Sequence, residues 1–326
     1  MRPDSTPHLL IPFAACSAEA WLPMLQSLPP DSFKRLGQLL QGMKLVQTDI
    51  RDAESLSPPH ERALARALGL ATLQTPDGLM PWAASEAVEQ LQAGLEKAWA
   101  WITPCHWAMG HLHATLSDPA LLDLQESESR SLLALMQPYF ETDGITLHFQ
   151  TPGRWLAEGE LFRGLPTASI DRVLARNVDA WLPDTKSAAP LRRLQNEMQM
   201  LLYTHAFNDE REARRQLRVN SFWISGTGAL PASAMPPGQR PLVSVLRSLA
   251  EAVFREDWAG YAQAWAALEA GDIAALLARQ QRGESVRLTL CGDNSAQTFE
   301  THRTGLWTKI SSLFSPLRTL DVLKQL

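Results

Sequence analysis

Apolar positions along the chain follow two spacings, one typical of helices and one typical of strands. From 190 to 204, apolar residues recur every three or four positions and line one face of a helix. The same spacing, with caps and breakers, predicts helices over 31–43, 57–69, 85–99, 128–137, 167–177 and 242–282. Short apolar or alternating runs predict strands over 8–15, 98–104, 143–150, 219–225 and 285–292.

Strands separated by helices favour an α/β fold, with a mixed β-sheet flanked by helices and a helical C-terminal part over 242–282. The clearest internal linker is 183–190, so we expect α/β regions over 1–183 and 184–326, packed as one compact unit. The Pro-rich stretch 229–241 is a second candidate junction or lid. The tail from Gly305 is predicted to form an amphipathic helix.

Composition narrows the class of protein. Of the 326 residues, 45% are hydrophobic, which is enough for a sizeable core. The net charge is −5 and no long basic run occurs, which argues against a nucleic-acid partner. No apolar stretch approaches the length of a membrane span or a signal peptide core, so no membrane partner is expected. Three cysteines lie far apart, a pattern that indicates a reducing cytoplasm.

Polar residues follow the helix over 190–204 and the segment after it. Asn196 and Gln199 share a helix face, which is either solvated or in contact with a ligand or another domain. Arg211 and Arg214 lie three positions apart on the next predicted helix. They can clamp a phosphate or carboxylate, or pair with nearby surface acids. His205 stands at a helix end, as a cap, a core residue or a base.

A short strand follows and ends in Gly226-Thr227-Gly228, which is either a tight turn or a nest of backbone N–H groups for an anion. We therefore predict a pocket for a small anionic molecule in this region. Its predicted residues are Asn196, Gln199, His205, Asn208, Arg211, Arg214, Asn220, Trp223, Gly226 and Gly228.

The pattern NExQMLL…H…N…RE…R…VNSxW…GxG-x-LP within 190–231 resembles a bacterial family of cofactor-independent phosphoglycerate mutase-like proteins, also called Rpf-type regulatory proteins. The part Asn-Ser-x-Trp…Gly-x-Gly is similar to a segment of archaeal-type cofactor-independent phosphoglycerate mutases. A looser likeness continues upstream through 103–107, 143–147, 154–155 and 176–183. The resemblance implies an alkaline-phosphatase-like core and, for an active member, two divalent metals and a nucleophilic serine.

The carboxylates and histidines of a two-metal centre must converge on both ions. The first predicted strand instead runs into Ala14-Ala15-Cys16, and the late strand ends at Cys291-Gly292-Asp293-Asn294, with one carboxylate. Downstream of His205 the chain has one histidine, His302. We therefore predict a non-catalytic mutase-like protein without a cofactor, which binds a small anion or has a regulatory role.

Two other functions remain open. The first is an active mutase or phosphoryl-transfer enzyme that uses a divalent metal such as Mn or Zn. The second is a scaffold that binds a protein partner through its tryptophans and the region 242–282.

A second group of ligand-type residues occurs at Cys105, His106, His111 and His113. All are residue types that bind zinc, but their spacing matches no standard zinc finger. A structural role beside Trp101 and Trp107 is the favoured interpretation.

Overall fold

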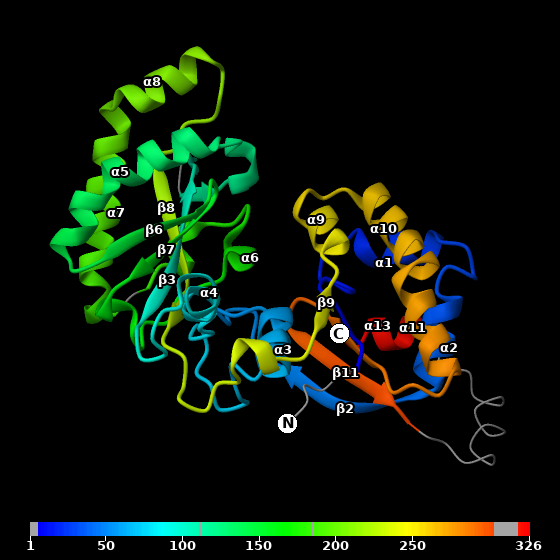
Figure 1. Ribbon diagram of the computed structural model, residues 1–326. Helices are drawn as coiled ribbons and strands as arrows, with labels where there is room; N and C mark the ends of the chain where they lie inside the picture. Colours follow the sequence, from blue (N-terminus) through cyan, green and yellow to red (C-terminus); the bar gives the residue numbers. More distant parts are fainter. Residues whose placement is uncertain (1–5, 111–112, 184, 303–318) are drawn as a thin grey trace. The chain divides into compact units, whose positions relative to one another are not determined.

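The computed structural model describes residues 6–110, 113–183, 185–302 and 319–326 (Figure 1). The chain divides into two compact units. Unit 1 consists of Met1–Glu54, Pro58–Leu68 and Gly238–Leu326, and unit 2 consists of Ser55–Ser57 and Gly69–Pro237.

The boundary expected after residue 183 falls inside unit 2. The stretch 183–190 leads directly into a helix with a proline in its first turn, where the missing N–H is tolerated. Ala188 and Leu191 are buried in the core of unit 2, so this stretch belongs to that core and does not link two domains.

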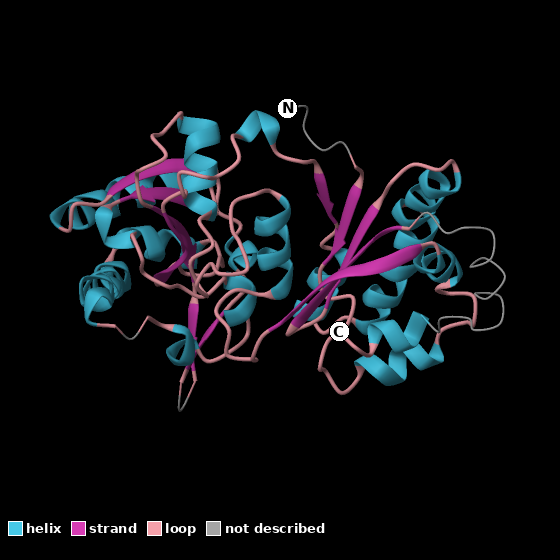
Figure 2. Ribbon diagram, turned by 90° about the horizontal axis from the view of Figure 1, so that it is seen from below, coloured by secondary structure: helices cyan, strands magenta, loops and turns pink. Residues whose placement is uncertain are grey.

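Unit 1 is built on a five-stranded mixed sheet in the order β2-β11-β10-β1-β9. β1 pairs in parallel with β9 and β10, whereas β10–β11 and β11–β2 are antiparallel. The strands are β1 (His8–Ile11), β2 (Met43–Ile50), β9 (Val243–Val245), β10 (Arg287–Cys291) and β11 (Ser295–Thr301). A mixed sheet flanked by helices confirms the predicted fold class (Figure 2).

Helices cover both faces of this sheet. Leu9 and Ile11 of β1 join a large core with the helices α1 (Trp21–Ser27), α2 (Lys34–Gln41), α9 (Ser248–Phe254), α10 (Trp258–Ala270), α11 (Asp272–Gln281) and α13 (Thr319–Leu323). Successive side chains of a strand point to opposite faces. Leu10 accordingly lies in a second cluster with Cys291, Ala296 and Ala63 of α3 (Pro59–Ala67).

Unit 2 contains an antiparallel sheet in the order β6-β7-β3-β8. Its strands are β3 (Trp99–Cys105), β6 (Thr146–Thr151), β7 (Arg154–Glu158) and β8 (Ser221–Gly228), and a separate hairpin joins β4 (Trp107–Met109) to β5 (Ala114–Leu116). Its helices are α4 (Trp82–Leu91), α5 (Glu126–Thr142), α6 (Ile170–Val173), α7 (Ala189–Thr204) and α8 (Ala206–Ala213). Short 3-10 turns lie at Pro119–Leu122, Glu160–Phe162, Val178–Trp181 and Lys186–Ala188, and another at Pro237–Gln239 crosses the unit boundary.

Most of the predicted helices and strands are present, but several bounds differ. The helix expected over 85–99 ends at Leu91, and the helix expected over 167–177 is only the short α6. The helix expected to stop at Pro138 continues to Thr142, because Met136 and Phe140 are buried in the core and offset the missing proline hydrogen bond. The region 242–282 is helical except for β9 at its start. The tail helix expected from Gly305 falls on 305–318, outside the described residues. None of the described helices is long and apolar enough to cross a membrane.

Candidate functional site

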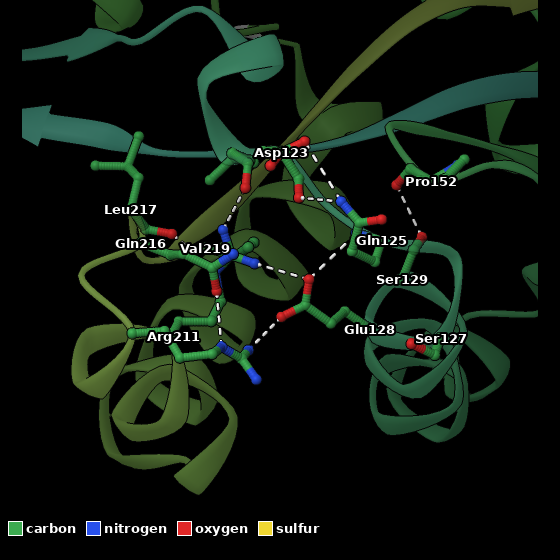
Figure 3. Close-up of polar contacts among 12 residues, drawn as sticks. Asp123, Gln125, Ser127, Glu128, Ser129, Pro152, Arg211, Gln216, Leu217 and Val219 are labelled. Carbon is green, nitrogen blue, oxygen red and sulfur yellow. Dashed lines mark hydrogen bonds and ion pairs between the residues drawn. The ribbon is translucent and has the colours of Figure 1, made fainter.

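Arg211 and Arg214, the predicted anion clamp, do converge on a carboxylate. That carboxylate is the chain's own Glu128, on α5 (Figure 3). The Arg211 side chain is fully buried, and its Nη1 lies 3.2 Å from Glu128 Oε2. Its Nε donates to Leu217 O at 2.8 Å and its Nη2 donates to Leu122 O. Arg211 therefore ties the start of α5 to the loop that leads into β8.

The negative charge of Glu128 stabilises the buried guanidinium of Arg211. Burial lowers the pKa of Arg211, and the charge and hydrogen bond of Glu128 oppose this shift. Glu128 also accepts a hydrogen bond from the backbone N–H of Gln125 at 3.1 Å, as part of the capping box that begins α5. The Glu128 carboxylate thus binds two guanidiniums and a backbone N–H at the start of α5.

Asn208 is buried and joins three segments of backbone. Its Nδ2 donates to Leu202 O at 2.7 Å and Val219 O at 2.8 Å, and its Oδ1 accepts from Val219 N at 3.0 Å. The cap of α8 is His205, whose Nδ1 accepts from Phe207 N at 3.1 Å. Asp209 lies in the first turn of this helix.

The other polar residues of the predicted pocket also contact the chain itself. Asn220 forms two hydrogen bonds with the backbone of Trp107. Its Oδ1 accepts from Trp107 N at 2.7 Å, and its Nδ2 donates to Trp107 O at 2.9 Å. The indole N–H of Trp223 donates to Ala168 O at 2.9 Å, and the Gln199 amide lies 3.4 Å from Ser221 Oγ. Asn196 is exposed. The structure therefore brings most of the predicted set together around α7, α8 and β8, as a hydrogen-bonded frame.

The glycines of the Gly-Thr-Gly segment form the end of β8. The pairing of β8 with β3 shifts between Trp99 and Trp101, and Gly226 has a φ of +63° beside this irregularity. A Cβ atom on Gly226 would lie 2.9 Å from the Trp101 ring. Gly228 also has positive φ, at +129°. Close packing against Trp101 thus explains the glycine at 226.

The variant Gly226→Ala is expected to lower the free energy of unfolding by about 1–3 kcal/mol. The added methyl group must displace the Trp101 ring while the backbone keeps an unfavourable φ. Urea unfolding followed by tryptophan fluorescence measures this. Gly153→Ala is the control, because a Cβ there meets nothing within 4 Å. Equal stability of the two variants would show that the contact with Trp101 imposes no constraint.

The candidate zinc ligands that the structure describes differ in their surroundings. Cys105 is buried among Trp107, Trp223 and other apolar side chains, and burial raises the pKa of its thiol, which disfavours the thiolate that binds metal. His106 Nδ1 lies 3.0 Å from Arg218 O. His113 is exposed, and His111 lies outside the described residues.

Sequence reasoning did not pair Ser17 with Asp293, which meet at the carboxyl edge of the unit 1 sheet. β1 and β10 run in parallel, and Ala14 N donates to Cys291 O at 2.7 Å, so the segments that follow these strands lie side by side. Asp293 Oδ2 accepts from Ser17 N at 2.7 Å and from Ser17 Oγ at 2.6 Å. Ligands of open α/β sheets bind at such an edge. No motif links two residues 276 positions apart, so only the pairing of β1 with β10 reveals this contact.

Buried side chains hold the backbone that leads to Ser17. Tyr261 Oη lies 2.8 Å from Phe13 O and 3.1 Å from Ala14 O, and it accepts from Trp21 Nε1 at 3.1 Å. Burial raises the pKa of Tyr261, so the phenol stays protonated as a donor. Burial likewise raises the pKa of Cys16 to about 11, so this thiol is protonated at neutral pH.

The donor set at this edge does not fit a two-metal centre. Among the described residues that follow β1 and β10, 12–17 and 292–294, Asp293 is the single carboxylate and there is no histidine. Two metals held about 3.5–4 Å apart require several such ligands. Asp49, a further buried carboxylate of unit 1, is instead bonded to arginines.

No family model and no curated protein matches the sequence. Among solved structures, the chain is similar to "Cofactor-Independent Phosphoglycerate Mutase from Thermoplasma acidophilum DSM 1728", with 14% identity and a TM-score of 0.34 over 98% of this chain and 99% of that one. It is also similar to "Structure of PH0037 protein from Pyrococcus horikoshii", with 11% identity and a TM-score of 0.45 over 92% of this chain and 88% of that one. Both likenesses are distant.

Proposed function

We propose that this chain is a phosphoglycerate mutase-like protein without phosphoryl-transfer activity, which acts by binding a small anionic ligand. The resemblance of the segment 190–231 supports the family. The proposed lack of phosphoryl transfer rests on the sheet edge formed by the described residues that follow β1 and β10. The one carboxylate there, Asp293, already accepts two hydrogen bonds from Ser17. Such an edge offers a place for a ligand but too few ligands for two metals.

The test is an activity assay on the purified full chain with Mn²⁺ or Zn²⁺ added. Interconversion of 3- and 2-phosphoglycerate and hydrolysis of p-nitrophenyl phosphate are measured in parallel. We expect rates equal to the blank without protein, and the same rates for Ser17→Ala. Turnover that disappears in Ser17→Ala would contradict the proposal.

A working phosphoryl-transfer enzyme is the second candidate, and one distance favours it. Ser17 Oγ lies 2.6 Å from Asp293 Oδ2, the arrangement of a hydroxyl nucleophile beside a base. In such an enzyme Ser17 Oγ would attack the phosphorus of a phosphate ester while Asp293 takes the serine proton. The ester's P–O bond would break, and the departing alkoxide would accept that proton and leave as the alcohol. Ser17→Ala and Asp293→Asn would then both abolish a measurable rate, whereas a binding protein shows no rate to lose.

A further inference from the structure

Three arginines of unit 1 surround one carboxylate where β2 ends and α3 packs on the sheet. We call Asp49, Arg51, Arg62 and Arg66 the arginine cluster. Asp49 Oδ2 lies 3.1 Å from Arg62 Nε and 2.6 Å from Arg66 Nη1. Asp49 Oδ1 lies 4.0 Å from Arg51 Nε. Arg62 and Arg66 are four positions apart on α3, so their side chains point the same way.

Positive charge exceeds negative charge within this cluster. Guanidinium groups stay protonated in proteins, so the four residues of the cluster carry three positive charges and one negative charge. The Asp49 and Arg62 side chains are almost fully buried, where charges are less screened than in water. Burial raises the pKa of Asp49, but hydrogen bonds and charges from Arg62 and Arg66 outweigh this effect and hold it below its usual value. The local potential therefore favours a second negative group.

The cluster also offers one buried donor without an acceptor and one exposed guanidinium. Arg66 Nε is buried and has no hydrogen-bond acceptor among the described residues. The Arg51 side chain is 45% exposed and only loosely paired with Asp49. A planar guanidinium binds a phosphate or carboxylate through two parallel N–H groups. Arg51 and Arg66 both lie within 4.0 Å of the Asp49 carboxylate, so their guanidiniums are neighbours.

The position of the cluster agrees with that of a ligand site. Arg51 N donates to Asn294 O at 3.0 Å, so Arg51 lies beside the turn between β10 and β11. That turn also carries Asp293, at the carboxyl edge of the parallel strands. Ligands of open α/β sheets bind outside this edge.

We propose that the arginine cluster binds a small oxyanion, a phosphate group or a carboxylate, between Arg51 and Arg66. This inference rests on the proposed function, since it locates the ligand of that binding protein and names its chemical class. It moves the expected anion contact from Arg211 and Arg214, which hold Glu128, to unit 1.

Isothermal titration calorimetry of the full chain with inorganic phosphate at constant ionic strength tests the proposal. We expect saturable binding to one site, weakened at least tenfold in Arg51→Ala and in Arg66→Gln. The matched control is Arg279→Ala, also in unit 1, whose side chain is 48% exposed and should leave the affinity unchanged. A parallel titration with acetate separates carboxylate from phosphate as the preferred group.

Absence of saturable binding of either anion, or equal affinity in Arg51→Ala, would overturn the inference. Arg66→Gln also removes a bond to Asp49 and is expected to cost stability, so the exposed Arg51 keeps the test independent of folding. Phosphoglycerate turnover with normal phosphate binding would overturn the proposed function alone. An inactive protein that binds phosphate or acetate with the same affinity in wild type and in Arg51→Ala would overturn this inference alone.

Discussion

Replacing Arg211 with alanine is expected to lower the free energy of unfolding of unit 2 by about 3–5 kcal/mol, the usual effect of removing one partner of a buried ion pair. The guanidinium has no exposed surface and binds Glu128, Leu122 O and Leu217 O. Its removal leaves two carbonyl groups and part of a carboxylate without donors. Urea unfolding followed by tryptophan fluorescence measures the change.

Arg214→Ala is the matched control for this variant. Arg214 binds the same carboxylate, Glu128, but its side chain is 51% exposed. An exposed ion pair contributes about 0–1 kcal/mol, so the control should unfold nearly as the wild type does. If both variants lose the same stability, burial is not what makes Arg211 important.

Asn208→Ala is expected to lower the free energy of unfolding by about 2–4 kcal/mol, because each buried group left unsatisfied costs about 1–3 kcal/mol. The variant removes three hydrogen bonds, to Leu202 O, Val219 O and Val219 N. Faster hydrogen exchange of the Val219 amide, together with the urea midpoint, measures the loss.

Asn196→Ala provides the comparison for Asn208, since it is also an asparagine but is exposed on α7. A surface substitution of this kind changes stability by about 0.5 kcal/mol or less. An unchanged exchange rate at Val219 in Asn208→Ala would mean that water replaces the side chain without cost.

The contacts of Arg211 and Asn208 explain why the sequence of the segment 190–231 suggested a ligand pocket. Side chains such as Arg211 and Asn208 have the donors that a ligand site needs, and the sequence alone cannot tell whether the acceptors belong to a ligand or to the chain. Glu128 lies 83 positions before Arg211, so no local spacing connects them. The structure supplies the acceptor within unit 2.

Helices and strands were predicted where apolar spacing is regular. The face of α7 and the alternation of β10 are examples. Six strands among the described residues were missed, β2, β4, β5, β7, β9 and β11, and two of them show why. In β2 only Asp49 is buried, so no apolar alternation marks this edge strand. In β7 the buried residues Trp155, Leu156 and Ala157 are consecutive, so they show neither the alternation of a strand nor the three-to-four spacing of a helix. Their strand conformation follows from their pairing partners.

The sequence by itself determined the mixed α/β class, the main helices and the polar character of the segment 190–231, because these depend on local spacing and residue type. Tertiary structure alone decided which polar and charged side chains meet. Parallel pairing of β1 with β10 brings Ser17 to Asp293, and packing of α3 on the sheet brings Arg62 and Arg66 to Asp49. Such contacts join residues distant along the chain, and the hydrophobic core positions the strands and helices that carry them.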